Sequence, residues 1–141
     1  MSALIEIRMD GTPVGKGRPR FSRATGHTYT PEKTARFEER LAWTAQGVMA
    51  GRPLLDGPLA VSVFAFMDIP KSKPKRWRED ALANRIHPTS KPDADNIAKM
   101  LDALNKVVWV DDSQIVYLAV HKRYSDRPRL EISVCSDWVG P

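Results

Sequence analysis

The sequence has little of what secreted, zinc-binding or membrane-spanning proteins need. Cys135 is its only cysteine, so no internal disulfide is possible and a reduced, cytoplasmic protein is expected. Its three histidines, His27, His87 and His121, lack the spacing of a zinc ligand set. No apolar run approaches the roughly 20 residues that span a bilayer, and the N-terminus has no secretory apolar segment. We therefore expect no membrane association.

Acidic residues are also in the minority. The 141 residues include 17 Asp and Glu against 22 Lys and Arg, a formal net charge of +5. A positive balance favours an anionic partner, of which nucleic acid is the simplest. With 42% hydrophobic residues, a chain of this length can bury one core and has little room for two. No repeat or low-complexity tract divides it, so one domain over residues 1–141 is predicted.

Hydrophobic patterning predicts an α+β fold, a small mixed β-sheet flanked by helices. Alternating apolar residues over Ala3–Met9 predict a half-buried strand. Pro31, preceded by Thr30, predicts the start of a helix that stops near Gly51. The run Leu59–Met67 is apolar on both faces and predicts a central strand. Two further segments, Ile115–Lys122 and Arg129–Val134, read as a pair of strands joined through residues 125–128.

Five aspartates are gathered in one short stretch of this basic chain: Asp93, Asp95, Asp102, Asp111 and Asp112. Carboxylates so crowded repel one another unless a cation compensates them. Mg²⁺ prefers carboxylate oxygens and water as ligands. Acidic metal ligands within a basic surface suit an enzyme that cuts a polyanion.

Local patterning predicts how these carboxylates come together. Pro92 keeps the chain extended before Asp93, and Asp93 or Asp95 can then cap a helix that runs to about Asn105. One face of that helix is expected to join the core, through Ile97, Met100, Leu101, Leu104 and Val108. The opposite face presents Asp95, Lys99 and Asp102 at i, i+4 and i+7.

After the apolar run 107–110, Asp111 and Asp112 are expected to approach from a neighbouring strand edge. Each feature has an ordinary structural explanation: Asp95 as a helix cap, Asp95 with Lys99 as a surface ion pair, and Asp111-Asp112 as a turn. Capping uses one carboxylate only. The combination is therefore better explained by a metal site.

These residues resemble the RusA-type Holliday junction resolvases, small endodeoxyribonucleases common in prophages. The family signature is similar to Lys/Arg-Pro-Asp-x-Asp-Asn-x-x-Lys, then Asp-Ala-Leu, then Trp-x-Asp-Asp-x-Gln-Ile/Val. This chain matches it at Lys91–Lys99, Asp102–Leu104 and Trp109–Ile115. Residues 13–21 and 29–33 also look like the phage branch of the family, so the resemblance covers nearly the whole chain.

The resemblance implies a RusA-like fold and a set of site residues. Asp93, Asp95 and Asp112 would be catalytic carboxylates that bind Mg²⁺, which Mn²⁺ is expected to replace, with Lys99 an essential companion. Asp111 is a further candidate ligand. The family usually has one more residue between the motif lysine and Asp-Ala-Leu, so the resemblance gives Asp102 no role. It also implies a homodimer, whose two active sites would cut the two strands of a four-way DNA junction.

Two basic loops are predicted to contact DNA phosphates. The first is an exposed, mobile arm, Gly15–Arg20, with Arg23 nearby. The second is the positive run Lys71–Arg78, in which Trp77 either stacks on an unpaired base or packs on the core. The candidate DNA-binding residues are Lys16, Arg18, Arg20, Arg23, Lys71, Lys73, Lys75, Arg76 and Trp77.

Two other classes of protein remain as alternatives. A non-catalytic basic DNA-binding protein would account for the basic loops and leave the aspartates unexplained. A metal-dependent phosphatase would account for Asp93-Ala94-Asp95, although such enzymes usually place this motif after an apolar strand. Here Lys91-Pro92 stands in that position.

Overall fold

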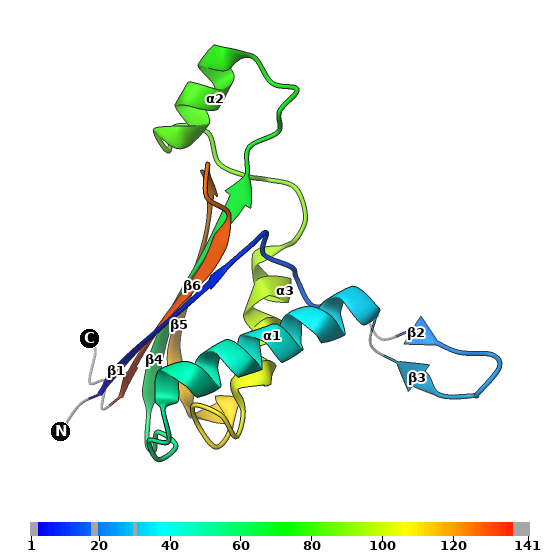
Figure 1. The fold of residues 1–141 in the computed structure, drawn as a ribbon, viewed down its shortest axis with the longest axis vertical. Helices are drawn as coiled ribbons and strands as arrows, with labels where there is room; N and C mark the ends of the chain where they lie inside the picture. The colour runs from blue at the N-terminus through cyan, green and yellow to red at the C-terminus, as the bar shows by residue number, and fades with distance from the viewer. Residues whose placement is uncertain (1–2, 18–19, 30, 137–141) are drawn as a thin grey trace.

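The computed structural model describes residues 3–17, 20–29 and 31–136 (Figure 1). The strands are β1 (Leu4–Asp10), β2 (Arg20–Phe21), β3 (Thr28–Tyr29), β4 (Leu59–Asp68), β5 (Ile115–Ser125) and β6 (Arg129–Ser136). The helices are α1 (Glu32–Met49), α2 (Lys75–Leu82) and α3 (Ala94–Ala98), with the 3₁₀ helices η1 (Lys99–Leu104) and η2 (Asp112–Gln114). This is the α+β fold that the sequence predicts.

Four strands form one mixed sheet in the order β1-β6-β4-β5. The buried residues of β1 are Ile5, Ile7 and Met9, so the predicted alternation is confirmed. β4 lies inside the sheet, as predicted, parallel to β5 and antiparallel to β6. The short strands β2 and β3 form a separate hairpin that projects beyond the start of α1 (Figure 1).

The prediction for α1 is confirmed over its length. The helix begins at Glu32, directly after Pro31, and Thr30 lies outside the described residues. Its buried side chains recur every three or four residues, at Thr34, Phe37, Leu41, Ala45 and Met49. The helix ends at Met49; its C-cap residue Ala50 takes the left-handed conformation with φ 49°, and Gly51 follows with φ 79°. Glycine adopts that conformation without a steric penalty, which explains the predicted stop.

The helices that build the core with the sheet lie on one of its faces (Figure 1). β4 is therefore fully buried on one face only, although its sequence is apolar on both faces. Its residues alternate between fully buried and half-buried. On the half-buried face, Phe64 stacks on His121 with ring centroids 4.4 Å apart, and the Arg129 guanidinium lies 3.8 Å from the centre of the Phe66 ring.

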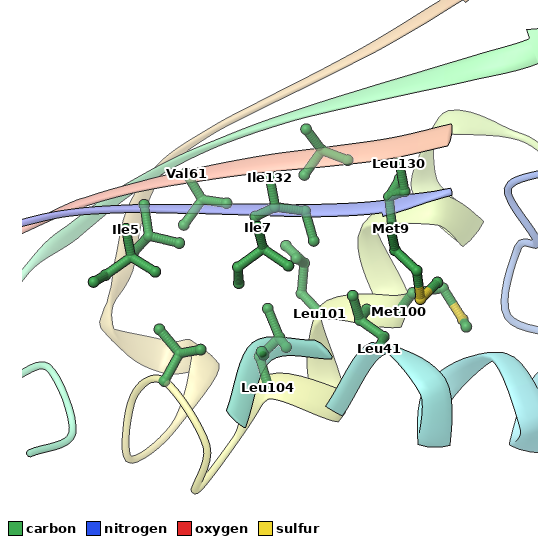
Figure 2. Close-up of a cluster of buried hydrophobic side chains, with 14 of the residues drawn as sticks. Ile5, Ile7, Met9, Leu41, Val61, Met100, Leu101, Leu104, Leu130 and Ile132 are labelled. Atoms are coloured by element: carbon green, nitrogen blue, oxygen red, sulfur yellow. The ribbon is translucent and has the colours of Figure 1, made fainter. Parts of the chain in front are cut away.

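The core lies between this sheet and α1, α3 and η1 (Figure 2). Ile97, Met100, Leu101, Leu104 and Val108 are all buried, as the sequence predicts. Figure 2 shows Met100, Leu101 and Leu104 on the helical side, facing Ile7 and Ile132 of the sheet. The aspartates therefore belong to a segment that is anchored by its apolar face. Among the described helices, none is long and apolar enough to cross a bilayer.

β5 and β6 are both strands, but they are not neighbours, because β4 lies between them. Parallel strands cannot be joined by a tight turn, since the chain must return from the end of one strand to the start of the next. Residues 69–114 make this return from β4 to β5. They carry α2, α3, η1 and η2, and with them all five clustered aspartates.

We predict that Leu41→Ala lowers the free energy of unfolding by about 2–5 kcal/mol, because it leaves a cavity in the core. Leu41 is 0% exposed, whereas Trp43, two residues along the same helix, is 71% exposed. Trp43→Ala is the control and should change stability by about 0.5 kcal/mol or less. Urea unfolding followed by circular dichroism measures both. Equal losses in the two variants would contradict the packing described here.

Candidate functional site

A groove of about 1080 Å³ lies between the N-terminal loop, the start of α1 and the segment that opens α3. Its lining residues include Lys16, Arg20, Lys33, Lys91, Asp93, Asp95, Asn96 and Lys99. Two of the predicted catalytic carboxylates thus line the same groove as four lysines and an arginine. Such a mixture suits a polyanion whose phosphates contact the cationic side chains next to a carboxylate-bound cation.

Asp93 and Asp95 come into the groove from the start of α3. Asp93 occupies the cap position with extended backbone, φ −70° and ψ 154°, but its side chain makes no capping hydrogen bond. Capping by Asp93, one of the predicted alternatives, is therefore not observed. Both carboxylates are exposed, which leaves their oxygens available to a cation.

Lys99 lies one turn beyond Asp95. Its Nζ is 4.0 Å from Asp95 Oδ2, the ion pair that the i, i+4 spacing predicts. Both side chains are mostly exposed, so the pair itself stabilises the fold very little. Its significance is that it places an ammonium group beside a groove carboxylate.

The predicted helix to Asn105 is wrong in its second half, because the α-helix ends at Ala98 and a 3₁₀ helix continues from Lys99 to Leu104. A 3₁₀ helix has about 3.0 residues per turn, so residues three apart lie on the same side. Asp102 therefore returns to the side of Lys99.

Asp102 and Asp112 are joined by a hydrogen bond between their side chains. This bond is the main cause that raises the pKa of Asp112, with burial and the charge of Asp102 adding to it. Burial opposes ionisation of Asp102, yet the hydrogen bonds from Asp112 and Lys16 lower its pKa overall. Asp112 thus ionises less readily than an isolated carboxyl group, and Asp102 more readily. A divalent cation is the natural replacement for a proton held between two carboxylates.

Lys16 was predicted to contact DNA from an exposed, mobile arm, but the structure places its ammonium group between two carboxylates. Its Nζ is 3.0 Å from Asp102 Oδ2 and 3.5 Å from Glu38 Oε1, and both carboxylates help to raise its pKa against the effect of burial. Its backbone N–H donates to Asn96 O at 2.9 Å. The loop up to Gly17 is therefore fixed against α3 and α1, and the exposed, mobile arm is not observed there.

The remaining candidates in this loop region are placed differently. Arg20 in β2 is exposed and lines the groove, and Arg23 is exposed in the β2–β3 hairpin. Arg18 lies outside the described residues. Lys33 and Lys91 also line the groove, although they were not among the predicted DNA contacts. Their position depends on how α1 packs beside α3, which no local pattern in the sequence encodes.

Asp111 is engaged in local structure. Its carboxylate accepts the N–H of Ser113 at 3.0 Å and caps η2, and this hydrogen bonding lowers its pKa. Gln114 completes the capping box through the N–H of Asp111. The turn, which the sequence offered as the alternative to metal binding, is thus formed.

The apolar run 107–110 forms no strand; it makes only isolated bridges to its neighbours. Trp109 is fully buried, and its indole N–H donates to Asn105 Oδ1 at 2.7 Å. A buried indole needs such a partner, since an unpaired N–H loses its hydrogen bond to water. Trp109 therefore anchors the turn that brings Asp112 to Asp102.

The second basic run lies on and before α2, at the end of the sheet where β4 finishes (Figure 1). Its exposed cationic residues include Lys71, Lys73, Lys75 and Arg76. Trp77 is half-buried and packs edge-on against Tyr124, with ring centroids 5.5 Å apart. Packing on the fold, the alternative to base stacking, is thus what the structure shows for Trp77.

The predicted metal ligands form two groups. Asp93 and Asp95 line the groove, whereas Asp112 is paired with Asp102. Within the described ranges, no three His, Cys, Asp or Glu side chains are grouped closely enough to hold a metal ion. The donors themselves are carboxylates, which fit the chemistry of Mg²⁺.

Comparison with known proteins gives two matches. The family model described as Endodeoxyribonuclease RusA matches residues 10–135. The uncharacterized protein YqaN of Bacillus subtilis (strain 168) is 38% identical over 137 residues, which cover 92% of this chain and 94% of that protein. The family match extends over the groove, α3 and the turn that holds Asp112.

The raised pKa of Asp112 predicts how stability changes with pH in metal-free protein. The folded pKa lies above that of an unfolded Asp, about 3.9, so folding is destabilised as pH rises through the folded value and Asp112 ionises beside Asp102. In EDTA at pH 7, Asp112→Asn should therefore melt at a higher temperature than the wild type, and the difference should shrink toward pH 4. Asp126→Asn, in the exposed β5–β6 turn, is the control. A lower melting temperature for Asp112→Asn at pH 7 would contradict this electrostatic arrangement.

Proposed function

This chain belongs to the RusA endodeoxyribonuclease family, and we propose that it is a Mg²⁺-dependent endonuclease that resolves four-way DNA junctions by paired phosphodiester cleavage. The observation that supports this most strongly is the groove, where Asp93 and Asp95 lie among lysine and arginine side chains. A site for a small phosphate ester needs no such extended cationic lining. A DNA-binding module needs no carboxylates beside its phosphate contacts.

The residues divide the chemistry between them. We assign Asp93, Asp95 and Asp112 to cation binding, for which Asp112 must be ionised although its neighbour Asp102 raises its pKa. Held by these carboxylates, Mg²⁺, or Mn²⁺ in its place, would activate a water and stabilise the leaving 3′ oxygen. Lys99, 4.0 Å from Asp95, lies where an ammonium group can neutralise charge that develops on the phosphate.

DNA binding is assigned to two areas. In the groove, Arg20, Lys33 and Lys91 are placed to hold the phosphates that flank the bond to be cut. At the far end of the sheet, Lys71, Lys73, Lys75 and Arg76 form a second exposed positive area. Two separate areas suit a branched substrate, because they can hold different arms. Phosphate contacts of this kind position the DNA without reading its sequence.

Resolution of a four-way junction requires a cut in each of two strands related by symmetry. Each chain has one groove lined by Asp93 and Asp95, and so a single candidate cleavage site. We therefore propose a homodimer, in which two-fold symmetry gives each of the two strands its own site.

Asp95→Asn should reduce cleavage of a synthetic four-way junction by about 100-fold or more, because it removes a charged ligand from the proposed cation site. Junction binding should persist, since the lysines of the groove are unchanged. Cleavage in Mg²⁺ and in EDTA, with gel-shift binding alongside, measures both effects. Asp126→Asn serves as the control for loss of one negative charge.

The same assay separates the other two classes of protein. Junction binding with no cleavage by the wild type in Mg²⁺ would indicate a non-catalytic DNA-binding protein. Hydrolysis of p-nitrophenyl phosphate with intact junctions would indicate a phosphatase. Near-normal cutting by Asp95→Asn would refute the assignment of that residue alone.

Neutralising the exposed residues Lys71, Lys73, Lys75 and Arg76 together, each to Gln, should weaken junction binding and flatten its dependence on salt. Each lost phosphate contact reduces the slope of log K against log salt by about 0.9 on duplex arms. Cleavage of junction that is already saturated should change little, because these side chains lie away from the groove. An unchanged slope with lost turnover would show that this area acts in dimer assembly or chemistry instead.

A further inference from the structure

The β2–β3 hairpin, residues 20–29, projects beyond the start of α1 (Figure 1). Hydrogen bonds between its own residues close it: the N–H of Ser22 donates to His27 O at 2.9 Å, and the N–H of Gly26 donates to Ser22 O at 2.8 Å. None of the described residues of the hairpin belongs to the hydrophobic core. The hairpin is therefore a surface projection, and its side chains are not needed to fill the interior.

Two large aromatic side chains are exposed on this projection. Phe21 is 63% exposed and Tyr29 is 49% exposed. Within the described ranges, neither ring stacks on another ring or lies against a cationic side chain. The half-buried Trp77, by contrast, packs against Tyr124. Both rings of the hairpin are thus available to a ligand.

The pairing of the strands places the two rings on opposite faces of the hairpin. Arg20 is paired with Tyr29, and Phe21 with Thr28. Side chains of cross-strand partners share a face, and successive residues of a strand alternate between faces. Tyr29 therefore lies on the same face as Arg20, which lines the groove, and Phe21 lies on the other face.

The charge of this region fits a nucleic acid. Residues 11–31 include four lysines and arginines and no aspartate or glutamate. Arg20 and Arg23 are exposed on the hairpin itself. Cationic side chains contact phosphates, while exposed aromatic rings stack on bases. In an intact duplex each base pair is already stacked on its neighbours, whereas the pair next to a branch point can present a free face.

We propose that the hairpin recognises the branch point of the junction. Phe21 and Tyr29 stack on the terminal base pairs of two different arms, one on each face, while Arg20 and Arg23 contact the adjoining phosphates. The proposal rests on the function proposed above and deepens it, because it assigns the preference for branched over linear DNA to two side chains. Preference of this kind is a difference between two affinities, so both must be measured.

The experiment measures binding in EDTA to a four-way junction and to a linear duplex with the sequence of its arms. We expect Phe21→Ala and Tyr29→Ala each to weaken junction binding by about 10-fold, since a ring stacked on a base contributes an effect of this order. Duplex affinity should stay within about 2-fold and the salt slope should not change, because no phosphate contact is removed. Trp43→Ala is the matched control: Trp43 is 71% exposed but belongs to α1, and its loss should change neither affinity.

Fluorescence locates the contact. The base analogue aminopurine, placed in the pair next to the branch point, is quenched when an aromatic ring stacks on it. Junction bound by Phe21→Ala or Tyr29→Ala should therefore fluoresce more strongly than junction bound by the wild type. Aminopurine in the middle of an arm should report no difference. Equal fluorescence in all complexes at the branch point contradicts stacking.

Conservative variants separate the ring from the bulk of the side chain. Phe21→Tyr and Tyr29→Phe keep a ring and should bind the junction within about 3-fold of the wild type. Phe21→Leu and Tyr29→Leu keep an apolar side chain without a ring and should lose affinity as the alanine variants do. If circular dichroism shows that an alanine variant does not fold, the leucine variant decides by the same criteria.

Several outcomes overturn the proposal. Equal losses on junction and duplex would make the rings general DNA contacts, and wild-type junction affinity in both alanine variants would leave them no role. Dissociation of a dimer by these variants in analytical ultracentrifugation would make the hairpin a subunit contact. A wild type that cuts junctions while the ring variants keep its full preference overturns this proposal alone. A wild type that prefers junctions through these rings but cuts none supports it and refutes the nuclease function.

Discussion

The parallel pairing of β4 with β5 is the constraint on which the site depends. Two parallel strands must be joined by a crossover that returns along the sheet, and here residues 69–114 make that return. The crossover lays α3 and η1 beside α1, on the face that also buries Ile7 and Ile132. A hydrogen bond of 2.7 Å from Lys122 Nζ to Ser90 O ties it to β5 just before the motif begins. The groove exists because this segment packs next to the N-terminal loop.

Within that framework, the site places like charges together. Asp102 raises the pKa of Asp112, and Asp93 and Asp95 are exposed in the groove, so carboxylates that repel one another when ionised lie close together. Neighbouring groups from several elements offset this repulsion. Lys16 compensates Asp102, Lys99 stands beside Asp95, and the buried indole of Trp109 fixes the following turn. Such arrangements are typical of sites that trade stability for ligand binding.

Much of the local structure followed from the sequence. The alternation in β1 and the spacing of buried residues in α1 are direct consequences of which side chains must leave water. The order of the strands did not follow, because alternation tells which face a residue occupies and not which strand lies beside it. That is why β5 and β6 were read as a pair although β4 separates them. The sequence also did not tell what covers the second face of β4, since Phe64 and Phe66 are apolar whether a helix or an arginine covers them.

The sequence by itself determined the chemistry that the molecule can offer: a run in which Asp95 and Lys99 lie one turn apart on the side opposite the core, with Asp93 just before them. Only the tertiary structure decided which further groups meet that run. Lys16 and Asp102 are 86 residues apart, and nothing near either of them in the chain encodes their contact. The placement of Asp102 depends on the change from α to 3₁₀ winding at Lys99. The packing of Trp77 depends on the position of Tyr124. Local periodicity reflects interactions over a few residues, whereas these contacts arise from how separate elements pack around one core.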